Sequence, residues 1–167
     1  ETIARAVAAR ATGPAVVLGS VAVLRRAVQQ CGLLLSVARI DQPEDALLAP
    51  SGCITVWQPP TLADGGLQAL PMGQVHAEAG RAAAACIDAA AALALQGRVV
   101  AMVTAPIHKE ALSAAGVHFP GHTEMLQAAA GGVPVRMMLA NDELRVVLVT
   151  IHVALRRAIE LLDFDAV

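Results

Sequence analysis

The residues of this chain that could do chemistry are concentrated between positions 104 and 126, in the segment TAPIHKEALSAAGVHFPGHTEML. His108, Lys109, His122 and Thr123 all lie within it. Histidine binds metal ions or transfers protons, whereas a lysine side chain or the free N–H groups at a helix start can bind a phosphate or a carboxylate. The segment therefore predicts a binding site for a small anionic ligand.

Each polar group follows an apolar run that has the composition of a strand. Residues 98–103 (RVVAMV) lead toward His108 and Lys109, and residues 144–150 (LRVVLVT) lead into Ile151 and His152. In open α/β sheets, ligands collect beyond the carboxyl ends of the strands. We therefore expect both groups at such an edge. The pattern alone leaves His152 open between a metal ligand and a structural residue.

The candidate residues also have structural interpretations. Thr123 is typical of a helix N-cap, and Lys109 beside Glu110 is typical of a solvated helix turn. His76 and His118 have the setting of surface residues, and we assign them no function. The three cysteines are expected to be small core residues, because none lies in a basic environment that would activate a thiol.

The elements that must position these residues alternate between strands and helices, which predicts an α/β class with a mostly parallel sheet flanked by helices. Strands are expected at residues 15–19, 33–40, 53–57 and 98–103, with an antiparallel pair at 133–140 and 144–152. Helices are expected at residues 1–10, 20–30, 74–96, 107–116 with Pro106 in the first turn, 123–130 and 154–162. The Pro- and Gly-rich residues 58–73 are expected to form a surface loop or a connector between lobes.

Composition excludes several classes of protein. The 167 residues carry a formal net charge of −2 without a basic run, and only 2% are aromatic, which argues against nucleic-acid binding. No uninterrupted apolar stretch is long enough for a membrane span. Three widely separated cysteines form no disulfide framework, so a cytoplasmic location is expected. The chain contains neither of the usual nucleotide-binding glycine loops, GxGxxG and GxxxxGK[ST].

Two segments, TAPIHKEALSAAGVHFPGHTEML and VRMMLANDELRVVLVTIHVAL, resemble the 4-hydroxythreonine-4-phosphate dehydrogenases of pyridoxal phosphate (vitamin B6) biosynthesis. GQVHAEAGRAAAACIDAA and ETIARAVAA are similar to the long helix and the first helix of that family. The resemblance implies the fold of isocitrate and isopropylmalate dehydrogenases. It also implies NAD-dependent, divalent-metal-assisted oxidation and decarboxylation of 4-phosphooxy-L-threonine to 3-amino-2-oxopropyl phosphate. The metal would be Zn, Mg or Co, and the protein a homodimer with its site at the subunit interface.

Residue by residue, the resemblance assigns roles within the polar segment and beyond it. His122 and Thr123 match the family's substrate-binding His-Thr pair, and His152 matches the first of three metal-binding histidines. Lys109 and His108 belong to the family's P-x-H-K block and would support phosphate binding or catalysis.

The resemblance also has departures. Family chains are about twice as long, with a Gly/Pro-rich loop before the position of Glu1 and a later segment that carries the other two metal histidines. Residues 1–167 are therefore expected to form one incomplete α/β unit, the N-terminal half of a two-lobed chain, inactive alone. The sequence IHVAL at 151–155 also departs from the family pattern, which more often has a threonine before the histidine and a proline soon after it.

Other functions stay open at this point. A paralogous dehydrogenase that acts on another phosphorylated hydroxy acid, of the phosphothreonate or phosphoerythronate type, shares these motifs. A non-catalytic remnant could bind a phosphorylated metabolite without converting it. A metal-dependent hydrolase is disfavoured, because the sequence has no ligand cluster of its own.

Overall fold

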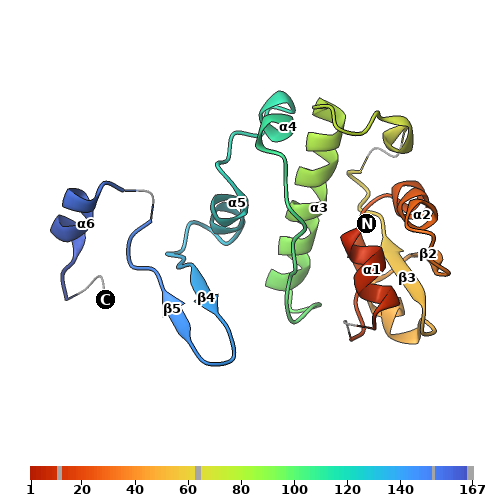
Figure 1. Cartoon of the computed structure of the whole chain (residues 1–167), viewed down its shortest axis with the longest axis horizontal. Coiled ribbons are helices and arrows are strands. Elements are labelled where there is room, and N and C mark those ends of the chain that lie inside the picture. The colour runs from red at the N-terminus through yellow and green to blue at the C-terminus, as the bar shows by residue number, and fades with distance from the viewer. Residues whose placement is uncertain (11–12, 63–64, 152, 165–167) are drawn as a thin grey trace. The chain divides into compact units, whose positions relative to one another are not determined.

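The structure of the chain, a computed structural model, describes residues 1–10, 13–62, 65–151 and 153–164 (Figure 1). The chain divides into two compact units, residues Glu1–Gly131 and Gly132–Val167. The helices of the first unit are α1 (Thr2–Ala8), α2 (Val21–Gln30), α3 (Ala77–Leu95), α4 (Lys109–Ala114) and α5 (His122–Ala129), with short 3-10 helices η1 (Pro43–Leu48) and η2 (Leu67–Ala69). Its strands are β1 (Val17–Leu18), β2 (Ser36–Ile40) and β3 (Cys53–Trp57). The second unit contains β4 (Met138–Ala140), β5 (Arg145–Val147) and α6 (Leu155–Leu161).

A three-stranded parallel sheet organises the first unit. Its strand order is β1-β3-β2, so β3 is central. Val17 of β1 pairs with Val56, and Ile40 of β2 pairs with Trp57. Parallel sheets are usually covered on both faces, in agreement with the three buried residues at the centre of β3. The predicted α/β class with a parallel sheet and flanking helices is confirmed.

Helices α1 and α2 contribute to the core that lies against this sheet. Ala4 of α1 and Val28 of α2 form a buried cluster with Ile54 and Val56 of β3. Ile54 and Val56 are two residues apart, so they point to the same face of the sheet. Helix α2 begins where it does because Ser20 is its N-cap, with Oγ accepting a hydrogen bond from the Val23 N–H at 3.4 Å.

The predicted strand at residues 98–103 is wrong. No residue in this segment has strand conformation, and the side chains of Val100 and Val103 are fully exposed, at 107% and 96%. A strand exists only when its backbone pairs with a neighbour, and no strand of the described chain pairs with this one. The apolar composition of residues 98–103 is typical of a strand, but it does not specify a segment with which they would pair.

An ion pair joins the first turn of η1 to the segment that follows α3. Arg98, which follows α3, donates to both carboxylate oxygens of Glu44, with Nε–Oε1 at 2.8 Å and Nη2–Oε2 at 2.7 Å. The hydrogen bonds from Arg98 lower the pKa of Glu44 to about 2. Two parallel hydrogen bonds fix the geometry of such a pair more strictly than one does.

Residues 58–73 contain η2 as a short piece of regular structure within their described part. Arg26 of α2 donates hydrogen bonds to the carbonyl oxygens of Gln68 and Leu70, so this part of the segment is held against α2 within the first unit. Its role as a connector between lobes stays a prediction, as does the assignment of residues 1–167 to one incomplete unit.

The second unit contains the predicted antiparallel hairpin and the predicted last helix. Met138 pairs with Val147, and Ala140 pairs with Arg145. The turn forms because Asn141 Oδ1 accepts hydrogen bonds from the N–H groups of Glu143 and Leu144, at 2.9 and 2.7 Å, a usual property of asparagine in turns. All residues of both strands are exposed.

No helix among the described residues is both long and apolar enough to cross a membrane.

Candidate substrate-binding site

Helix α3 is the common support of the two short helices that carry the candidate residues. Ala84 and Ile87 of α3 form a buried cluster with Leu112 of α4 and Met125 of α5. Leu112 is only 1% exposed and Met125 only 4%. Because α4 and α5 have six and eight residues, they are too short to be stable alone. Their packing against α3 therefore determines where their side chains lie.

His108 and Lys109 lie at the start of α4. His108 is the N-cap, and its Nδ1 accepts a hydrogen bond from the Ala111 N–H at 3.4 Å. A ring nitrogen that accepts a hydrogen bond carries no proton, so this geometry assigns the neutral ring's proton to Nε2. Lys109, the first residue of the helix, is exposed and is the only lysine in the chain. The expectation that Pro106 lies in the first helical turn is wrong, because His108 caps the helix two residues later.

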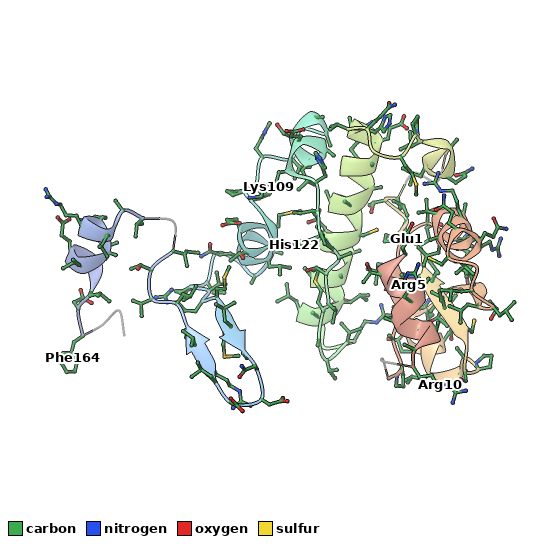
Figure 2. All side chains as sticks on the ribbon, in the orientation of Figure 1. Glu1, Arg5, Arg10, Lys109, His122 and Phe164 are labelled. Carbon is green, nitrogen blue, oxygen red and sulfur yellow. The ribbon has the colours of Figure 1, made fainter. Side chains whose placement is uncertain are left out.

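His122 and Thr123 are the first two residues of α5, and both are half-buried. The expectation that Thr123 caps this helix is wrong. The N-cap is Gly121, whose backbone is extended and whose carbonyl accepts from the Met125 N–H at 3.3 Å. The helix thus begins one residue before Thr123. Figure 2 shows Lys109 on α4 and His122 on α5.

The ring of His122 holds a polar atom without a partner. Its Nε2 is buried and makes no hydrogen bond with any residue that the structure describes. A buried polar atom without a partner costs about 1–3 kcal/mol, so such atoms are rare and call for an explanation. A ligand bound at the start of α5 could supply the missing hydrogen bond.

A negative charge lies at the start of α5. Glu124 lies in the first turn of this helix, where its carboxylate already interacts favourably with the helix dipole. An anionic ligand bound to the same turn would meet that negative charge. It therefore needs a cation from elsewhere, and Lys109 on the neighbouring short helix is one candidate.

His152, the predicted metal ligand, lies outside the residues that the structure describes. Among the described residues, no group of three His, Cys, Asp or Glu side chains is arranged to hold a metal ion. A catalytic metal usually has three protein ligands and an open position. The described part of the chain therefore does not form a complete metal site.

Two further buried polar atoms were not singled out by the sequence. His76, expected at the surface, is the half-buried N-cap of α3, and its Nε2 is buried without a described partner. Gln58, which follows β3, has a buried Oε1 in the same state. The place of Gln58 directly after a strand was the one available signal. His118 is exposed, as expected.

All three cysteines are free and half-buried, rather than in the core as expected, and burial raises the pKa of the Cys86 thiol to about 11. This thiol stays protonated at neutral pH, and the nucleophilic form of cysteine is the thiolate.

The parallel sheet with flanking helices places the chain in the isocitrate dehydrogenase-like fold class, in agreement with solved dehydrogenase structures. The family model described as "Pyridoxal phosphate biosynthetic protein PdxA" matches residues 11–167. The chain belongs to this family.

The comparisons with individual proteins agree with this assignment. A 4-hydroxythreonine-4-phosphate dehydrogenase from Beijerinckia indica is 46% identical over 152 residues, which cover 90% of this chain and 43% of the relative. A D-threonate 4-phosphate dehydrogenase from Pectobacterium atrosepticum is 42% identical, with coverage of 92% and 46%. The crystal structure of a 4-hydroxythreonine-4-phosphate dehydrogenase from Burkholderia phymatum matches with a TM-score of 0.80 and 38% identity, over 95% of this chain and 47% of that one. The chain thus spans about half the length of the relatives it matches.

Proposed function

We propose that this chain is the substrate-recognition part of a dehydrogenase that oxidises 4-phosphooxy-L-threonine with NAD in pyridoxal phosphate biosynthesis. The substrate's C3 hydroxyl becomes a ketone as a hydride passes to NAD and a proton is released, and the 3-oxo acid then loses CO2 to give 3-amino-2-oxopropyl phosphate. The observation that carries the proposal is the 46% identity to a relative of that name over 90% of the chain.

The residues of the two short helices have defined roles in this proposal. His122 and Thr123 bind the phosphorylated substrate, and the Nε2 of His122, which has no partner among the described residues, donates a hydrogen bond to it. Lys109 supplies the positive charge that a phosphate requires near Glu124. His108 fixes the start of α4 through its cap, which orients the adjacent Lys109.

NAD and a divalent cation enter the proposal through the family. His152 is proposed as one metal ligand, and the remaining ligands would come from outside these 167 residues. Because the described residues do not form a metal site, we derive no step that depends on the metal. The homodimer with a shared site and the cytoplasmic location also remain predictions.

A second candidate is a D-threonate 4-phosphate dehydrogenase, which is favoured by the 42% identity to a relative of that name. The two functions are separated by incubating the complete protein that carries this sequence with each substrate, NAD and a divalent cation. We expect NADH formation to be more efficient, in kcat/KM, with 4-phosphooxy-L-threonine. A higher kcat/KM for D-threonate 4-phosphate identifies the second function instead. Binding of either compound without NADH formation identifies a non-catalytic remnant.

A further inference from the structure

Gly80 is the one glycine of the described chain at which an added methyl group meets backbone atoms. A Cβ on Gly80 would lie 2.0 Å from the carbonyl oxygen of Ala111 and 2.5 Å from its carbonyl carbon. Gly80 lies on α3 and is buried, and Ala111 lies on α4. The missing side chain therefore allows the two helices to approach at this point.

Helix propensity disfavours glycine at this position. Helix α3 is rich in alanine, the best helix former, and a glycine within a helix costs about 1 kcal/mol relative to alanine. Gly80 also has no left-handed backbone conformation that would require glycine, in contrast to Gly97 and Gly116, at φ +71° and +81°. Steric contact with α4 is the remaining reason for glycine at this position.

We propose that Gly80 is a positioning residue for the substrate site, because it sets the place of α4 and thus of His108 and Lys109. This inference rests on the proposed function for its catalytic consequence. The carbonyl of Ala111 accepts a hydrogen bond from the Ala115 N–H at 3.0 Å within α4. A side chain at position 80 that displaces this carbonyl therefore displaces the whole of α4. Helix α3 has nineteen residues and α4 has six, so the shorter helix moves.

The displacement follows from the contact distances. Ordinary van der Waals contact begins at 3.4 Å, whereas the oxygen of Ala111 lies 2.0 Å from the added Cβ. Helix α4 must therefore retreat by about 1.4 Å, and Lys109 moves with it. A displacement of about 1 Å in a residue that orients substrate can lower the rate by about 100-fold. We expect Gly80→Ala to reduce kcat/KM by tenfold or more.

The test compares Gly80→Ala with Ile87→Val in the complete protein. Ile87 belongs to the same core cluster, and its truncation weakens the packing without pushing on Ala111. We expect a crystal structure of Gly80→Ala to show Lys109 displaced by about 1 Å or more relative to α3. We further expect the KM for the phosphorylated substrate to rise more than the KM for NAD. Ile87→Val should lower the melting temperature while its kinetic constants stay within about threefold of the parent.

A second pair of variants tests the cause. Because the clashing atoms belong to the backbone, Gly80→Ala combined with Ala111→Gly should be no more active than Gly80→Ala alone. Restored activity in the double variant overturns the steric argument. An unmoved α4 overturns the proposal, as does a displaced α4 with unchanged kinetics. A Gly80→Ala protein that does not fold also overturns it, because the proposal requires an intact α3.

The inference and the proposed function can fail separately. If the parent protein forms no NADH from the phosphorylated substrate, the proposed function is wrong. In that case two measurements on the parent and on Gly80→Ala decide the inference. The crystal structures show whether α4 is displaced, and calorimetry shows how tightly each protein binds 4-phosphooxy-L-threonine. Weaker binding together with a displaced helix supports it. Equal binding, or no binding to the parent, removes the role of Gly80 in substrate positioning.

Discussion

The buried nitrogen of His122 leads to a prediction in which binding and stability respond differently to one substitution. His122→Ala removes the hydrogen bond that Nε2 is proposed to make with the phosphorylated substrate. A hydrogen bond to a charged group contributes about 1.5–3 kcal/mol, which corresponds to about 10- to 150-fold in the dissociation constant. We expect the affinity for 4-phosphooxy-L-threonine to fall within that range.

The stability of the free protein should change little in the same variant. The ring of His122 is half-buried, so its removal loses some packing. The removal also ends the cost of about 1–3 kcal/mol for a buried nitrogen without a partner. The two effects have opposite signs, and we expect a net change in unfolding free energy of no more than about 1 kcal/mol.

Two other histidines provide matched controls. His108→Ala removes the imidazole that caps α4, so it should destabilise the fold by about 0.5–2 kcal/mol. His118→Ala changes an exposed side chain and should affect neither property.

The assay combines calorimetric titration of the substrate with urea unfolding, on the complete protein and each of the three variants. An unchanged affinity in His122→Ala refutes the proposed role of this residue. A loss of stability in His122→Ala equal to that in His108→Ala refutes the argument from the unpartnered nitrogen.

Three further predictions concern the core, a surface ion pair and the metal. Leu112→Ala should lower the unfolding free energy by about 2–5 kcal/mol in urea titrations, because it leaves a cavity where α3, α4 and α5 meet. The control Leu95→Ala, at a 62% exposed position, should lower it by less than about 0.5 kcal/mol. Equal losses would contradict the assigned core. Arg98→Gln should return the pKa of Glu44 from about 2 toward 4.5 in an NMR titration. Since the pKa of this carboxyl is lower in the folded state than in the unfolded state, its stabilisation is present above pH 4.5 and is lost as the pH falls toward 2. An unchanged pKa in the variant would show that the ion pair is not formed in solution. In the complete protein, His152→Ala should abolish metal-dependent NADH formation, and near-normal activity would show that His152 is no metal ligand.

The sequence predicted the elements whose signals are local. Strand β3, the long helix α3 and the turn at Asn141 follow from apolar runs, helix-forming residues and turn chemistry that are contained in a few neighbouring residues. The ends of the short helices were less predictable. Thr123 and Pro106 both have the composition of a helix start, but Gly121 and His108 are the N-caps, because the cap is decided by which backbone and side-chain groups meet in space.

By itself, the sequence determined the α/β class, the family resemblance and the concentration of polar residues between 104 and 126. Only the tertiary structure decided that residues 98–103 have no strand partner within the part of the chain that the structure describes, since pairing depends on a second segment that the run itself does not specify. It also identified the buried nitrogen of His122, which has no hydrogen-bond partner among the described residues, and the close approach of Gly80 to Ala111. Burial and steric contact arise between residues that are distant along the chain, and no local pattern records them.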